Sequence, residues 1–110
     1  GYAFSKECVQ VYTMKSAKDS LAASVRTNSV CPAPIDTPLL PDFNKTMSEK
    51  TMTWTIDQIG GTIATPRDIA LTLSFLGSDA SGYVNGVNLN VDMGFNAFMT
   101  TGQIDFSGLA

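Results

Sequence analysis

Residues 65–92 read TPRDIALTLSFLGSDASGYVNGVNLNVD and contain a helix start, a helix end, a turn and a strand in succession. Thr65 can cap a helix with its hydroxyl, Pro66 fits the first helical position, and Asp68 places an acid in the first turn. Gly77 is suited to end the helix, because glycine is favoured just past a helix C-terminus. The expected buried stripe of this helix consists of Ile69, Ala70, Leu73 and Leu76. After the turn, the run 87–92 alternates between apolar and polar residues, as a half-buried strand does.

A second helix and strand precede this pair. Residues 3–23 contain no Pro or Gly and carry a wide apolar stripe, which predicts a helix that is buried on more than one side. The stripe consists of Phe4, Cys8, Val11, Tyr12, Met14, Ala17, Leu21 and Ala22. The β-rich run 24–30 predicts a strand that stops before Pro32. The order helix, strand, loop, helix, strand indicates an α/β fold with a parallel sheet. Two strands do not form a viable sheet alone, so we expect oligomerisation to complete it.

The remaining segments are less regular. Residues 31–41, CPAPIDTPLLP, contain four prolines and predict a loop with a fixed backbone. Residues 42–65 predict one or two short helices followed by a turn at Gly60 and Gly61. We expect the tail from Gly94 to be irregular.

Composition excludes several classes of function. The 110 residues suit one domain, and a net charge of −3 without a basic run argues against nucleic-acid binding. No apolar stretch is long enough to span a membrane, and no leader is visible, so we expect a cytoplasmic protein. The absence of histidine removes histidine-based triads and histidine metal sites. Cys8 and Cys31 have neither metal-ligand nor redox spacing, so we expect reduced thiols and no metal.

Three blocks in the same order and spacing resemble the short-chain dehydrogenase/reductase family. YAFSK, at 2–6, matches the Y-x-x-x-K motif of that family, and SVRTNSVCPAPIDTPLL, at 24–40, resembles its strand, Asn and proline-rich segment. Residues 61–94 resemble its closing block, with Met93 in place of a glycine in the final Asp-Gly-Gly. The resemblance implies that 1–110 is a single, incomplete Rossmann-like domain, the C-terminal part of a doubly wound parallel sheet. Residues 38–64 correspond to the family's substrate loop. The tail 95–106 faintly resembles the bacterial 3α-hydroxysteroid and coniferyl-alcohol dehydrogenase branch.

The resemblance makes Tyr2 the acid/base and Lys6 its partner. Tyr2 and Lys6 are four residues apart and so share one face of a helix. A tyrosine of pKa ~10 is a poor base at neutral pH, and an ammonium group one turn away lowers that pKa. Lys6 would also hydrogen-bond the nicotinamide ribose of the cofactor. The alternative is that the pair lies on a solvated helix end.

Two further groups follow from the resemblance. Pro32, Ala33, Ile35 and Thr37 match positions that line the nicotinamide, with Ala33 standing where the family has glycine. The alternative is a stiff loop that only connects a strand to a helix. Substrate-binding positions are Leu39, Leu40, Met47 and Trp54, accompanied in the substrate loop by Phe43 and Met52. Flexible Met and a large aromatic residue suit a lid over a bulky apolar alcohol, but the same residues could form an ordinary core.

The sequence therefore predicts the C-terminal half of an NAD(P)-dependent oxidoreductase that interconverts a secondary alcohol and a ketone. No G-x-G-x-x-G follows a strand in these residues, so we expect this chain alone to bind no cofactor and to be inactive. We expect a homodimer or larger assembly, because the family pairs the Tyr-bearing helix between subunits. One alternative is a non-catalytic oligomerisation module of the same fold. Another is a nucleotide site rebuilt across an oligomer.

Overall fold

The computed structural model describes residues 1–36 and 49–109, and of Tyr2 the backbone alone. These residues belong to two compact units. The first unit comprises Gly1–Cys31 and Leu71–Leu89, and the second comprises Pro32–Ala70 and Asn90–Ala110. In chain order the elements are α1 (Tyr2–Ala22), β1 (Ser29–Pro32), α3 (Glu49–Gln58), α4 (Pro66–Leu76), the 3-10 turn η1 (Asp79–Ser81), β2 (Asn88–Val91), α5 (Phe95–Thr100) and the 3-10 turn η2 (Phe106–Leu109).

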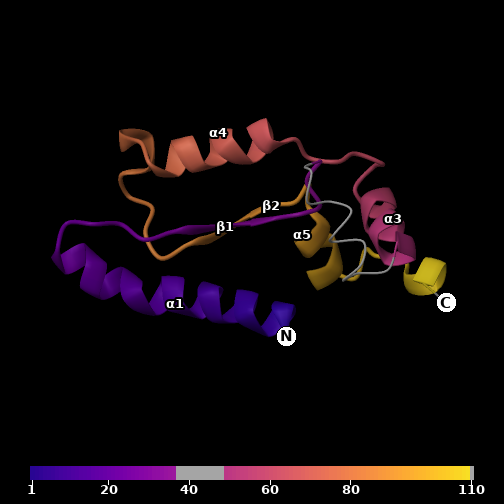
Figure 1. The fold of residues 1–110 in the computed structure, drawn as a ribbon, viewed down its shortest axis with the longest axis horizontal. Helices are drawn as coiled ribbons and strands as arrows, with labels where there is room; N and C mark the ends of the chain where they lie inside the picture. Colours follow the sequence, from indigo (N-terminus) through magenta and orange to yellow (C-terminus); the bar gives the residue numbers. More distant parts are fainter. Residues whose placement is uncertain (37–48, 110) are drawn as a thin grey trace. The chain divides into compact units, whose positions relative to one another are not determined.

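The strands β1 and β2 pair in parallel, which confirms the α/β prediction. The Ser29 amide donates to the Val87 carbonyl at 2.9 Å, and the Ala33 amide donates to the Val91 carbonyl at 3.3 Å. Residue numbers rise together along both strands, which is the parallel register. Within the first unit, α1 lies along one side of the strand pair and the last turns of α4 lie along the other (Figure 1).

The strand prediction for 24–30 was wrong at both ends. β1 begins at Ser29 and ends at Pro32, so part of the expected loop 31–41 is strand. The entrance to the strand is fixed instead by side-chain amides: the Thr27 amide donates to Asn85 Oδ1 at 2.9 Å, and the Val87 amide donates to Asn28 Oδ1 at 3.0 Å. Side-chain groups that satisfy the backbone in this way compete with a regular ladder.

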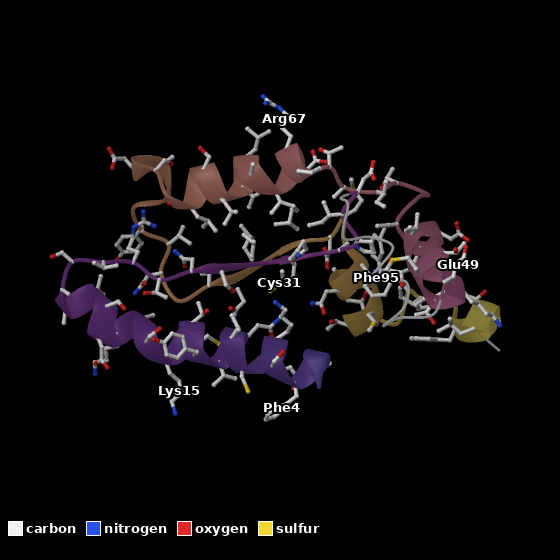
Figure 2. All side chains as sticks on the ribbon, in the orientation of Figure 1. Phe4, Lys15, Cys31, Glu49, Arg67 and Phe95 are labelled. Carbon is white, nitrogen blue, oxygen red and sulfur yellow. The ribbon has the colours of Figure 1, made fainter. Side chains whose placement is uncertain are left out.

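Helix α1 presents small and polar residues to the strands. Thr13 and Ala17 are buried, while the apolar stripe expected to be buried is largely exposed. Exposed members of that stripe are Phe4, Cys8, Val11, Tyr12, Met14, Leu21 and Ala22. Figure 2 shows Phe4 and Lys15 pointing away from the strands. The expectation of burial on more than one side is therefore wrong for the residues that the structure describes, because they include no partner for the outer face.

The C-terminus of α1 ends in a Schellman arrangement. The Val25 amide donates to the Ser20 carbonyl and the Ser24 amide donates to the Leu21 carbonyl, both at 2.9 Å. This pattern requires a left-handed residue, and Ser24 takes that role with φ +62°. A serine in this conformation stores strain that a glycine would not.

The predicted α4 start and end are confirmed in detail. The Thr65 hydroxyl donates to Asp68 Oδ2 at 2.9 Å and accepts from the Asp68 amide at 3.3 Å, while the Thr65 amide donates to Asp68 Oδ2 at 2.8 Å. These reciprocal bonds form a capping box. The bonds from Thr65, backbone first, lower the pKa of Asp68. Of the expected stripe, Ile69 and Leu76 are buried, whereas Ala70 and Leu73 are exposed.

Helix α3 carries several of the buried side chains of the second unit, and Ile59 and Ile69 add to them. Met52, Trp54 and Thr55 of this helix are buried, which confirms a helix within the span 42–65. The expectation of an irregular tail from Gly94 was wrong, since α5 and η2 lie within it. Asp92 explains the first of these, because its carboxylate accepts from the Gly94 amide at 3.0 Å and from the Asn96 amide at 2.9 Å. The N-cap of α5 is Gly94, and Asp92 satisfies amides of the helix start from two residues earlier, a signal that the tail's composition obscured.

Candidate functional site

The proposed acid/base pair lies at the start of α1. Tyr2 and Lys6 both fall within the first turns of this helix, and Lys6 is exposed. The helix therefore realises the four-residue spacing on which their predicted pairing depends. The roles of the two residues stay predictions.

Polar bonds within the first unit fix α1 against the strands. The backbone carbonyl of Gln10 accepts from Asn88 Nδ2 at 3.2 Å, and the side-chain Nε2 of Gln10 donates to Cys31 Sγ at 3.3 Å. About two turns further on, the Ala17 carbonyl accepts from Asn85 Nδ2 at 3.2 Å. These bonds set the rotation of the helix that carries Tyr2 and Lys6. Both cysteines are free thiols.

The same face of α1 also makes a close approach. A Cβ added at Gly86 would lie 3.1 Å from the Ala17 Cβ, and Gly86 has φ +73°. Glycine is therefore required here for two separate reasons, the backbone conformation and the proximity of the helix. Sequence reasoning missed this anchor, although the polar and small residues at 10, 13, 17 and 20 recur with helical spacing and could have indicated it.

Arg26 is a second feature that the sequence did not reveal. Its guanidinium donates to the Ser81 hydroxyl and the Val84 carbonyl, both at 3.1 Å, and to the Ser78 carbonyl at 3.3 Å. Ser81 is fully buried and donates to the Leu76 carbonyl at 2.8 Å. Asn28 adds a bond from its Nδ2 to the Val84 carbonyl at 3.0 Å. Together these contacts tie the start of β1 to the turn between α4 and β2.

The predicted nicotinamide segment begins at the carboxyl end of β1 in the second unit. Pro32 ends the strand, and the Ala33 amide is held by the Val91 carbonyl. Ile35 forms an isolated parallel bridge with Ala64, in which the Asp36 amide donates to the Ala64 carbonyl at 2.8 Å. This bond uses the amide of Asp36 rather than that of Ile35. Ligands of open α/β sheets bind at the carboxyl ends of the strands, and the predicted segment begins at such an end.

The structure describes only part of the predicted site. Tyr2 and Lys6 belong to the first unit, whereas Pro32, Ala33 and Ile35 belong to the second. Thr37, Leu39, Leu40, Phe43 and Met47 lie outside the described residues. Among the substrate-loop residues that are described, Met52 and Trp54 are buried.

The helix that directly follows β2 does not fit the phosphates of a dinucleotide. A pyrophosphate binds at the N-terminus of a helix that follows a strand, where free backbone amides point at it. β2 leads directly into α5, but the amides of Gly94 and Asn96 are already bound by the Asp92 carboxylate. This helix start therefore does not offer a phosphate site. Among residues 1–36 and 49–109, no group of three or more cysteine or acidic side chains is placed to hold a metal ion.

A surface pocket of about 460 Å³ lies on α3 in the second unit. It is lined by Glu49, Lys50, Thr53, Trp54, Asp57 and Gly108. Its size is within the range of small-molecule sites. Its charged walls distinguish it from the apolar lid that the methionine and tryptophan residues of this segment predict.

A family match decides what kind of protein this is. Residues 1–96 match the family model described as "Enoyl-(Acyl carrier protein) reductase". The chain belongs to the short-chain dehydrogenase/reductase family. The resemblance read from the sequence is confirmed at this level, while the steroid and coniferyl-alcohol branch is not. In the described part of this family member, no helix is long and apolar enough to cross a membrane.

Known proteins support the same assignment. The chain is 36% identical over 100 residues to cis-4-hydroxycyclohexanecarboxylate dehydrogenase of Sinomonas cyclohexanicum, covering 87% of this chain and 37% of that protein. Among solved structures, it is similar to levodione reductase, with a TM-score of 0.78 and 27% identity over 88% of this chain and 40% of that one. It is also similar to 4-hydroxyisoleucine dehydrogenase complexed with NADH, with a TM-score of 0.72 and 28% identity over 87% and 39%. The chain spans 34% to 37% of the length of the first curated relatives.

Proposed function

We propose that this chain is the C-terminal, catalytic-pair-bearing part of an NAD(P)-dependent oxidoreductase that interconverts a secondary alcohol and a ketone. The observation that carries the proposal is the Tyr2–Lys6 spacing at the start of α1 in a chain of the short-chain dehydrogenase/reductase family. The substrate class finds support in relatives named as dehydrogenases of a hydroxycyclohexanecarboxylate and of galactitol.

The reaction removes a proton and a hydride from the alcohol. Tyr2, as phenolate, accepts the hydroxyl proton while the carbinol carbon loses its hydride and becomes the carbonyl carbon. A bound NAD or NADP supplies the hydride acceptor in this direction and the hydride donor in reverse. Lys6, as ammonium, lowers the pKa of Tyr2 and hydrogen-bonds the nicotinamide ribose. Pro32, Ala33, Ile35 and Thr37 line the nicotinamide. The segment 38–64 holds the substrate through contacts of Leu39, Leu40 and Met47, and Trp54 acts on the substrate by positioning this segment.

The test is a matched pair of tyrosine substitutions in the full-length enzyme that contains this chain. Tyr2→Phe should lower kcat by about 10²- to 10⁴-fold, the usual contribution of a general acid/base. Tyr12 lies on the same helix and is 72% exposed, so Tyr12→Phe should leave kcat unchanged. Near-normal turnover by the Tyr2→Phe enzyme would refute the assignment.

A second candidate function is a non-catalytic oligomerisation module, favoured by the exposed apolar face of α1. Phe4 is 69% exposed and Tyr12 is 72% exposed, although both are large and partly or wholly apolar. A second copy of the chain would cover this face and could complete the sheet. Size-exclusion chromatography of this chain with light scattering should give the mass of a dimer or a larger species. The substitution Tyr12→Lys should shift that mass toward the monomer. A monomer before any substitution would exclude this module.

The two candidate functions differ in the cofactor binding that they predict for the full-length protein. Both predict that this chain alone shows no saturable NADH binding at millimolar concentration, because no G-x-G-x-x-G follows a strand in its sequence and the start of α5 offers no phosphate site. Only the oxidoreductase predicts binding by the full-length protein. Enhancement of nicotinamide fluorescence distinguishes the two.

A further inference from the structure

Helix α3 and the C-terminal turn η2 of the second unit meet around one indole. Trp54 is only 9% exposed, and its Nε1 donates to the Asp105 carbonyl at 3.0 Å. Its ring lies 5.6 Å from the Phe106 ring and meets the Phe95 ring edge-on at 5.9 Å. Aromatic pairs at these separations are favourable beyond the area they bury. One side chain of α3 is therefore held by a directional bond and by two rings from the tail of the chain.

The turn that holds the indole is itself constrained. The Ser107 amide donates to Asp105 Oδ1 at 2.9 Å, and this backbone bond, the larger cause, lowers the pKa of Asp105. Gly108 lies against the same five-membered ring of the indole, where an added Cβ would be 3.0 Å from Trp54 Cδ1 and 3.5 Å from Nε1. The backbone can approach the ring this closely only because residue 108 has no side chain. The position of the ring is thus defined from several directions.

We propose that residues 105–109, here named the C-terminal clamp, fix the orientation of α3, and that Trp54 is a positioning residue that sets substrate affinity through this helix. This inference rests on the proposed function, in which 38–64 is the substrate segment. A buried indole N–H that loses its acceptor pays a desolvation cost, so rotation of α3 away from the Asp105 carbonyl is opposed. The clamp acts on substrate binding because α3 is the helix of that segment, and the indole itself is turned into the clamp.

Hydrogen exchange on this chain tests the clamp without reference to activity. Trp54→Phe keeps a ring but removes the donor, and should speed exchange of the α3 amides by about five- to tenfold, the worth of one neutral hydrogen bond. Amides of α1 should be unaffected. Gly108→Ala should also speed exchange in α3, whereas Gly77→Ala, whose Cβ would make ordinary contacts at 3.5 and 3.9 Å, should not. Unchanged α3 exchange in both the Trp54→Phe and Gly108→Ala chains would overturn the proposal.

The positioning role is tested in the full-length enzyme. Trp54→Phe and Gly108→Ala should each raise KM for the alcohol severalfold while kcat and KM for the nucleotide stay unchanged. An unchanged KM for the alcohol in both variants would overturn the positioning role. If the unsubstituted enzyme transfers no hydride, the proposed function fails, but the exchange result on α3 still reports on the clamp. The two failures are therefore distinguishable.

Discussion

Helices α1 and α3 bury their side chains in opposite ways. On α1 the buried face is small and polar, with Thr13 and Ala17, and the large apolar residues face outward. On α3 the buried residues include Met52 and Trp54, and the tail of the same chain covers the indole. α1 is held by hydrogen bonds and a close backbone approach, whereas α3 is held by an aromatic core. The difference is that the core of α3 is supplied within this chain, whereas the outer face of α1 carries apolar residues that the described part of the chain leaves exposed.

The largest loss of stability is expected when the aromatic core of α3 is removed. Trp54→Ala should lower the free energy of unfolding by about 3 kcal/mol, because it removes a large buried ring and leaves the Asp105 carbonyl without its donor. At a chain concentration low enough to give the monomer, Tyr12→Ala removes an exposed aromatic ring from the outer face of α1 and should change the free energy of unfolding by less than about 0.5 kcal/mol. Urea unfolding followed by circular dichroism measures both. Equal losses would contradict the contrast between the two helices.

The next effect tests the close approach of α1. Gly86→Ala should destabilise by about 2 kcal/mol, since alanine must adopt a positive φ and also displace the helix at Ala17. Gly102 has the same φ of +73° but nothing within 4 Å of an added Cβ, so Gly102→Ala should cost only about 1 kcal/mol. The difference between the two variants isolates the steric part. If the two variants lose the same free energy of unfolding, the position of α1 does not depend on the contact between Gly86 and Ala17.

Smaller effects of opposite sign are expected where a non-glycine residue takes a positive φ. Ser24 in the first unit has φ +62°, and Met93 in the second has φ +53°. Ser24→Gly and Met93→Gly should each raise the free energy of unfolding by about 0.5–1 kcal/mol through relief of this strain. Met93 is 68% exposed, so little packing is lost. Thermal unfolding of the two single variants would show the gain, and a lower melting temperature in either would refute the strain argument there.

The smallest effect is a pH dependence of the α4 capping box. The folded pKa of Asp68 is lowered, so its stabilising contribution is complete above the unfolded pKa, near 3.9, and is lost as pH falls through the folded pKa. Asp68→Asn should therefore flatten the stability profile below about pH 4. Asp57→Asn, an exposed change on α3, is the control. Unfolding midpoints measured from pH 6 to 2 would reveal an unaltered profile if the cap contributes nothing.

The sequence predicted local signals well and partner surfaces poorly. Thr65, Pro66 and Asp68 carry their capping chemistry within four residues, so α4 was placed correctly at its start. β1 was misplaced because Asn28 and Asn85 satisfy the backbone from distant positions, which no local pattern records. The outer face of α1 was expected to be buried because hydrophobic periodicity indicates a buried face without naming what covers it.

For the candidate site, the sequence predicted motifs but not their surroundings. The roles of the Tyr2–Lys6 pair and of the segment from Pro32 onward were predicted from motif spacing and stay predictions, while the family itself is confirmed. The anchors that orient them could not. Gln10 and Arg26 make their bonds to residues more than twenty positions away, so their importance emerges only when the chain is folded.

The measurement that tests the central claim most directly is the pH profile of alcohol oxidation by the full-length enzyme with Lys6→Met, compared with Lys15→Met. Both lysines are exposed on α1, but only Lys6 is one turn from Tyr2. Loss of the Lys6 ammonium should raise the pKa of Tyr2, so the rise of kcat with pH should move about one unit or more to higher pH. The Lys15→Met profile should match the unsubstituted enzyme. Identical profiles for all three enzymes would contradict the assignment of Tyr2 and Lys6 as a coupled catalytic pair.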